Sequence, residues 1–162
     1  MRKDLPDGWN PGPLESLNPD FLEKGDTDII NTLKIKIYYE DTDAGGVVYY
    51  ANYLRFMERG RTELLSDKGI DVVEYHDKGY FFPVVHVDIN YRRPAKLGEI
   101  LEVATEVVEI TNATITFKQE IFSDDAVLVE ATVKLACINR DGKPQRIPSE
   151  LASLFSDRKN NV

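Results

Sequence analysis

Two aspartates one residue apart, followed by two glycines, give this 162-residue chain its clearest candidate for chemistry. Asp41 and Asp43 lie in the segment YYEDTDAGGVVYYANYLRFMERGRTE, which spans residues 38–63. A carboxylate can act as a general base or as a nucleophile, and glycines let a substrate carbonyl approach backbone N–H groups. The pattern therefore indicates a turn at which an oxygen-rich substrate could react.

Two other interpretations of the acidic turn compete with catalysis. Asp is a preferred capping residue, so either carboxylate could accept hydrogen bonds from the first N–H groups of a following helix, which contributes about 1 kcal/mol. A calcium loop of the D-x-D-x-D-G type is excluded, because Gly45 occupies the third ligand position and Asn52 stands where a bidentate Glu is needed. Capping and catalysis both stay open on local sequence alone.

The elements that must position this turn are predicted by hydrophobic periodicity. Apolar side chains at helical spacing predict a long amphipathic helix from about Val48 to Lys68, with Gly69 placed for a left-handed residue at its end. Gly60 inside that helix costs about 1 kcal/mol relative to Ala, which indicates close packing against a flat sheet. Five strands are predicted over 33–39, 81–92, 100–111, 113–122 and 126–139.

The order of these elements is strand, one long helix and then four strands joined by links of hairpin length. It predicts an α+β fold in which an antiparallel sheet wraps around the helix, because the apolar face of a lone helix must be buried. The last predicted strand, 126–139, would leave an exposed edge unless a second subunit paired with it. A dimer is expected on that ground.

Composition and charge restrict the class of protein. Residues 1–31 hold four of the eight prolines and no sustained period, so we expect an irregular arm before a single domain over 32–162. The net charge of −8 argues against non-specific binding to nucleic acid or membranes. There is no signal-peptide pattern and no apolar run that could span a membrane, so a cytoplasmic protein is expected. The single cysteine, Cys137, has apolar neighbours and is predicted to be a buried, inert thiol.

The long motif at the turn resembles the signature of the hotdog-fold acyl-CoA thioesterases. It is similar to the hydroxybenzoyl-CoA thioesterases and to the thioesterases encoded beside the Tol–Pal envelope system, over about residues 33–148. The resemblance implies a five-stranded antiparallel sheet around one helix, a homodimer with a continuous sheet, commonly paired again into a homotetramer, and active sites at the subunit interface. The matching residues are Tyr39-x-Asp41-x-Asp43-Ala44-x-Gly46-x-Val48-x-Tyr50-x-Asn52-Tyr53, then Glu58-x-x-Arg61, and the segment 91–99.

The resemblance also implies roles for individual residues. Asp43 matches the catalytic carboxylate, as general base or as nucleophile, with Gly46 and the backbone N–H of Tyr50 beside it. The Tol–Pal branch usually carries His at the position of Tyr50 and the hydroxybenzoyl branch carries Tyr, so an aromatic or a short aliphatic acyl group stays open. Glu58 matches an acid that touches the acyl group across the interface; an ion pair with Arg55 or Arg61 is the alternative.

Coenzyme A carries several phosphates, and Arg92, Arg93 and Lys96 (the basic cluster) are suited to bind them, although a solvated hairpin end would look the same. Thr114 matches a Ser/Thr position near the pantetheine path. The prediction is an acyl-CoA thioesterase that needs no metal or cofactor, because CoA is part of the substrate. A hotdog dehydratase would need His on the helix, and none is there; a non-catalytic acyl-CoA-binding or partner-binding module remains the alternative.

Overall fold

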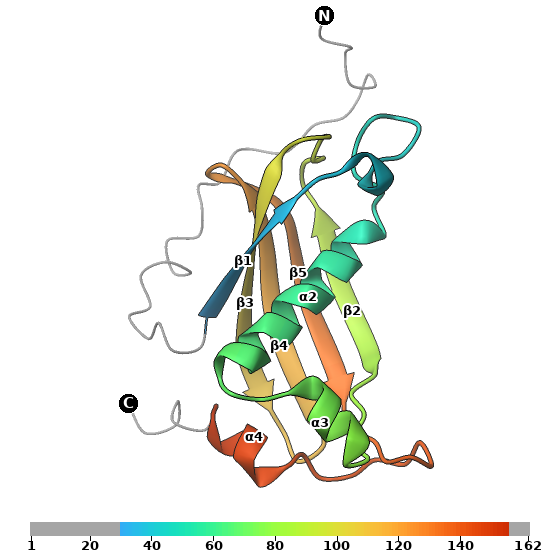
Figure 1. Ribbon diagram of the computed structural model, residues 1–162, viewed down its shortest axis with the longest axis vertical. Coiled ribbons are helices and arrows are strands. Elements are labelled where there is room, and N and C mark those ends of the chain that lie inside the picture. The colour runs from blue at the N-terminus through green and yellow to red at the C-terminus, as the bar shows by residue number, and fades with distance from the viewer. Residues whose placement is uncertain (1–29, 156–162) are drawn as a thin grey trace, which may run out of the picture.

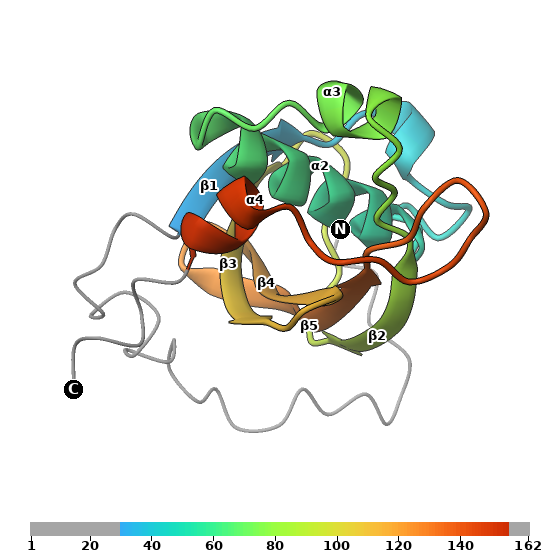
Figure 2. The same ribbon diagram turned by 90° about the horizontal axis from the view of Figure 1, so that it is seen from below.

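Five antiparallel strands curve around one long helix in the computed structural model, which describes residues 30–155 (Figures 1 and 2). This arrangement confirms the predicted α+β hotdog fold. The predicted arm, 1–31, lies almost wholly outside the described residues, as does the end of the predicted domain, 32–162. The strands are β1 (Ile30–Lys36), β2 (Val84–Tyr91), β3 (Ile100–Ile110), β4 (Thr114–Ser123) and β5 (Ala126–Ala136). The helical elements are the 3-10 turn η2 (Tyr39–Asp41), α2 (Asn52–Asp67), α3 (Val72–Asp77) and α4 (Ser149–Ser153).

Helix α2 buries one apolar face on the concave side of the sheet. The predicted close packing at Gly60 is confirmed, because a Cβ atom there would lie 2.7 Å from Thr105 Oγ1 and 3.0 Å from Val103 Cγ1. Beside it, the buried Gln119 side chain donates to Met57 O and to Thr105 Oγ1, both at 2.8 Å. These contacts fix the helix against β3 and β4.

Both ends of α2 depend on backbone hydrogen bonds. At its C-terminus Gly69 has a φ of 77°, and the N–H groups of Gly69 and Ile70 donate to Ser66 O and Leu65 O, each at 2.9 Å. This is a Schellman motif, and it confirms the predicted role of Gly69. At its N-terminus the helix begins at Asn52 rather than at Val48, because the preceding residues are bonded into the acidic turn.

The strand order, β1-β3-β4-β5-β2, corrects two predictions. The last strand, β5, is not an edge: it lies between β4 and β2. The link from β2 to β3 is not a hairpin, because it crosses the end of the sheet and β3 pairs with β1 and β4. The edge that the sequence assigned to β5 therefore belongs to β2, where Val84 and Val85 are exposed.

Two smaller expectations concern Cys137 and membranes. Cys137 is buried, as predicted, and burial raises the pKa of its thiol. None of the helices within 30–155 is both long and apolar enough to cross a membrane. The expected cytoplasmic location stays a prediction.

Candidate active site

The acidic turn is a tight loop closed by backbone hydrogen bonds. Thr42 and Val48 face each other in an antiparallel bridge, and the N–H of Asp43 donates to Val47 O at 2.9 Å. Inside the loop the N–H of Gly46 donates to Asp43 O at 3.0 Å, and Gly46 has a φ of 77°. A residue with a side chain would be strained in that backbone conformation, so glycine is needed at this position.

The Asp43 side chain is exposed and lines an open cleft of about 510 Å³. Its Oδ1 accepts the N–H of Gly45 at 2.8 Å, and among the residues described its Oδ2 accepts no hydrogen bond. The other residues that line the cleft are Tyr39, Thr42, Ala44, Gly46 and Leu97. One carboxylate oxygen is thus held by the turn, and the other accepts no hydrogen bond within the described residues.

The capping hypothesis is wrong for α2. Its N-cap residue is Ala51, and no side chain caps the helix. Asp41 instead accepts the N–H of Tyr38 through Oδ2 at 2.9 Å, which stabilises η2. Within residues 30–155 the backbone N–H of Tyr50, just before α2, donates to no backbone oxygen. An unpaired N–H at the positive end of a helix is suited to bind a developing oxyanion.

Two residues that the sequence did not assign to the site hold this helix start in place. The Asn52 side chain donates through Nδ2 to Asp41 O at 2.9 Å, which joins the helix to the acidic turn. The Tyr91 hydroxyl donates to Tyr50 O at 3.1 Å, and the two rings meet edge to face. The only sequence signal for either role is its place in the two matched segments.

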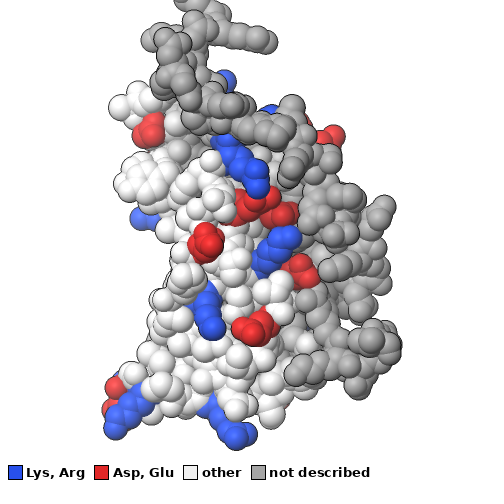
Figure 3. Space-filling view, turned by 180° about the vertical axis from the view of Figure 1, so that it is seen from behind, with Lys and Arg blue, Asp and Glu red and all other residues white. Residues whose placement is uncertain are grey.

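The bend that carries the basic cluster lies against the turn. Val47 bridges Lys96, and the buried Tyr53 hydroxyl accepts the N–H of Ala95 at 3.0 Å. Burial raises the pKa of Tyr53, so the phenol stays neutral. In the basic cluster, Arg92 is bound to Glu130 at 2.7 Å, whereas Arg93 and Lys96 have no carboxylate partner in the described part of the chain. On the outer sheet face, as far as Figure 3 shows it, acidic and basic side chains intermingle without a large patch of one sign.

Glu58 and Thr114 stand apart from this group. The Glu58 carboxylate accepts the Thr62 hydroxyl at 2.8 Å and makes no ion pair with Arg55 or Arg61 that the described structure records. Thr114 pairs with Ala136 at the far end of the sheet. Asp43, Gly46, Tyr50 and the basic cluster are therefore brought together in one subunit, and these two residues are not. No group of three or more His, Cys, Asp or Glu side chains within 30–155 could hold a metal ion.

A sheet wrapped around one helix, with an exposed carboxylate beside the start of that helix, defines the hotdog class of thioesterases. The chain belongs to the thioesterase-like superfamily, whose family model matches residues 38–155. The family predicted from the sequence is thereby confirmed.

Individual relatives agree with this assignment. The acyl-CoA thioesterase YbgC of Haemophilus influenzae is 42% identical over 123 residues, which cover 75% of this chain and 90% of that protein. A solved structure of a probable thioesterase from Bartonella henselae is 37% identical, with a TM-score of 0.70, and the match covers 74% of this chain and 99% of that one. A DHNA-CoA thioesterase from Staphylococcus aureus is 26% identical with a TM-score of 0.77, over 81% and 91% of the two chains.

Proposed function

We propose that the protein hydrolyses acyl-CoA thioesters to a free acid and coenzyme A, with Asp43 as the reacting carboxylate. The proposal rests on two groups near the start of α2. Within the described residues, Oδ2 of Asp43 accepts no hydrogen bond, and the backbone N–H of Tyr50 donates to no backbone oxygen. The names of the relatives support the substrate class, because the Haemophilus influenzae protein is called an acyl-CoA thioesterase.

In this mechanism the thioester carbonyl oxygen accepts the N–H of Tyr50, and the helix dipole stabilises the charge that develops on it. Asp43 either takes a proton from the attacking water or attacks the carbonyl itself. In the second case a mixed anhydride forms as the CoA thiolate leaves, and water then releases the acid. Label found on the aspartate after a single turnover in ¹⁸O-labelled water would show that the anhydride forms, because only attack of water at the Asp43 carbonyl of the anhydride puts it there.

The reaction is tested by measuring CoA release from a panel of acyl-CoAs that runs from acetyl-CoA to decanoyl-CoA and includes benzoyl-CoA. We expect steady turnover of at least one of them. If no thioester were hydrolysed while calorimetry still showed CoA binding, the protein would be a non-catalytic acyl-CoA-binding module.

The same proposal gives Arg93 and Lys96 the CoA phosphates. Replacing either residue by Ala should raise KM for acyl-CoA about tenfold, as expected for loss of a hydrogen bond to a charged group, and should change KM for the matching acyl-pantetheine far less. Arg92→Ala is the matched control and should have a smaller effect, because Arg92 is already bound to Glu130. Equal effects on both substrates would contradict phosphate binding.

The proposal also includes a homodimer joined through β2. An edge strand exposes a row of unpaired N–H and C=O groups, and a second β2 would pair with them to make the sheet continuous. Light scattering should give a mass of two or four chains of 18.4 kDa. A stable monomer would contradict this part of the proposal.

A further inference from the structure

Both peptide groups next to Tyr50 are held by hydrogen bonds to their oxygens. In the first, between Tyr49 and Tyr50, the oxygen accepts the backbone N–H of Asn52 at 2.9 Å. In the second, between Tyr50 and Ala51, the oxygen accepts the Tyr91 hydroxyl at 3.1 Å. Because a trans peptide group is planar, fixing its oxygen also restricts the direction of its N–H. The Tyr50 N–H, which is the oxyanion donor in the proposed reaction, is therefore aimed by Asn52.

Packing of its own side chains does not hold this segment. Tyr49 is 44% exposed and Tyr50 is 60% exposed, and neither residue belongs to a helix or a strand. The ring of Tyr91 is better fixed, because it contacts the rings of Tyr50 and of the buried Tyr53, with centroids 6.2 and 5.8 Å away. The Tyr91 hydroxyl therefore reaches Tyr50 O from a ring that is itself packed.

The Asn52 side chain joins the same segment to the acidic turn. Its Nδ2 donates to Asp41 O, and the N–H of Tyr49 donates to that oxygen as well, both at 2.9 Å. Asp43 follows two residues later in the turn, which is closed by the bond from the Asp43 N–H to Val47 O at 2.9 Å. Asn52 thus binds the peptide of the oxyanion donor with its backbone and the turn of the reacting carboxylate with its side chain.

We propose that Asn52 and Tyr91 are positioning residues for thioester hydrolysis. Asn52 sets the distance between the Asp43 carboxylate and the Tyr50 N–H, and Tyr91 keeps the residue that carries this N–H from turning. Neither side chain needs to touch the substrate. The inference rests on the proposed function, because the thioester supplies the carbonyl oxygen that the N–H binds. It holds whether Asp43 acts as base or as nucleophile, since both reactions place negative charge on that oxygen.

Asn52→Ala should lower kcat for the best acyl-CoA of the panel about a hundredfold, because a misplacement of about 1 Å in a catalytic group costs that much. KM should change by no more than about twofold, since the donor acts mainly on the charge of the transition state. The backbone bonds of residue 52 remain, and Ala suits a helix.

Asn139→Ala is the matched control for Asn52→Ala. The Asn139 side chain also bonds main-chain groups of a turn, because its Oδ1 accepts the N–H groups of Asp141 and Lys143, each at 3.0 Å. That turn follows β5 and contributes no residue to the proposed reaction. The control should keep the wild-type kcat.

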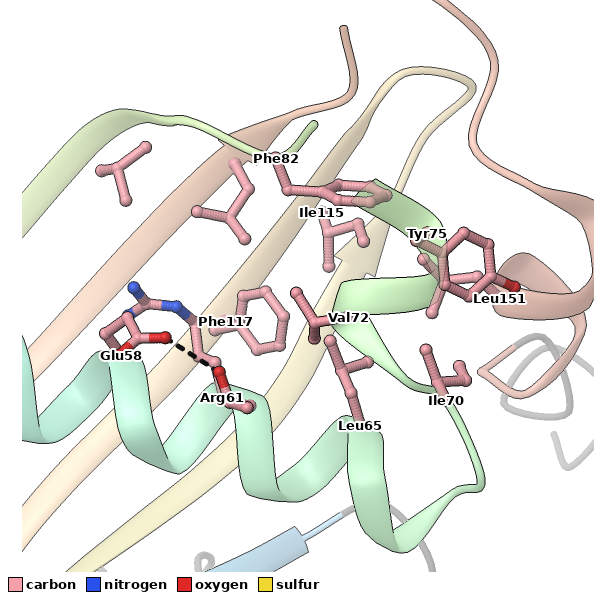
Figure 4. A pocket seen from close by; sticks show the side chains of 13 residues that line it. Glu58, Arg61, Leu65, Ile70, Val72, Tyr75, Phe82, Ile115, Phe117 and Leu151 are labelled. Atoms are coloured by element: carbon pink, nitrogen blue, oxygen red, sulfur yellow. Dashed lines mark hydrogen bonds between the residues drawn. The ribbon is translucent and has the colours of Figure 1, made fainter. Parts of the chain in front are cut away.

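Tyr91→Phe keeps the packed ring and removes only the hydroxyl. It should lower kcat about tenfold, the usual effect of losing one neutral hydrogen bond, again with KM nearly unchanged. Tyr75→Phe is the matched control. The Tyr75 hydroxyl in α3 donates to Glu150 of α4 at 3.3 Å, and its ring lines a pocket toward the C-terminal end of α2 (Figure 4). Removal of that hydroxyl should leave kcat at the wild-type value.

Infrared spectroscopy of a bound substrate separates positioning from a general loss of structure. In the slow Asp43→Asn variant, the best acyl-CoA of the panel is labelled with ¹³C at its carbonyl, and its C=O stretch is recorded. A hydrogen bond from the Tyr50 N–H lowers the frequency of that stretch relative to the free thioester. Adding Asn52→Ala or Tyr91→Phe should reverse most of this lowering, and adding Asn139→Ala should not.

Three outcomes are distinguishable. Wild-type kcat in both Asn52→Ala and Tyr91→Phe would show that backbone bonds alone hold the segment, and would overturn the inference. A lower kcat without any change in the C=O frequency would overturn it as well, because the oxyanion donor would still be in place. An inactive wild-type protein would instead overturn the proposed function itself.

Discussion

Asp43→Asn is expected to lower kcat/KM for the best acyl-CoA substrate by about a hundred- to ten-thousandfold. The substitution keeps the shape of the turn, because the Asn amide oxygen can still accept the N–H of Gly45 that Asp43 Oδ1 accepts at 2.8 Å. The amide can neither take a proton from water nor attack the thioester. The loss should therefore fall on kcat, with KM nearly unchanged.

The measurement is steady-state CoA release, with circular dichroism to verify the fold. Asp141→Asn is the matched control, because Asp141 also lies in an exposed turn, between β5 and α4. The Asp141→Asn protein should hydrolyse the substrate at the wild-type rate. A fully active Asp43→Asn protein would remove this carboxylate from the mechanism, even though the family assignment would stand.

Gly60→Ala should lower the free energy of unfolding by about 1–3 kcal/mol, the usual cost of overpacking a core. At an exposed helix position the same change would stabilise the protein by about 1 kcal/mol, because Ala is the better helix former. Here the new methyl group would lie 2.7 Å from Thr105 Oγ1 and 3.0 Å from Val103 Cγ1. The helix must then move away from β3, and the cost of that movement outweighs the gain in propensity.

Urea unfolding monitored by circular dichroism measures this effect. Thr105→Ala removes the closest atom, so Gly60→Ala should cost less in that background than in the wild type, and the difference gives the coupling between the two residues. A Gly60→Ala protein more stable than the wild type would mean that α2 does not press on the sheet at this point.

Local patterns were enough to predict most elements of the fold. The apolar residues of α2 recur at helical spacing, and runs of β-branched residues mark the strands. Gly60 and Gly69 lie where only glycine suits the packing or the backbone. The start of α2 was predicted too early, at Val48, because the apolar residues before Asn52 continue the helical period. Their N–H groups are taken by other partners: Val48 donates to Ala95 O and Tyr49 to Asp41 O, both at 2.9 Å.

Strand order could not be predicted in the same way. Alternation identifies a strand but not its neighbours, so the pairing of β2 with β5 was missed. In the candidate site, Asp43, Gly46 and Tyr50 were found because a long motif contains them, and their roles stay predictions. Asn52 and Tyr91 were missed because each bonds a main-chain oxygen, 11 and 41 residues away respectively.

The buried hydrogen bond between Tyr53 and Ala95 joins the first turn of α2 to the bend that holds Arg93 and Lys96. The place where a carbonyl would be polarised and the place where phosphates would be bound are thus parts of one rigid piece. Because the distance between these two places is fixed, only a carrier of matching length can put its thioester at the start of α2 while its phosphates contact Arg93 and Lys96. We therefore expect thioesters on truncated carriers to be poor substrates even when their acyl group is ideal.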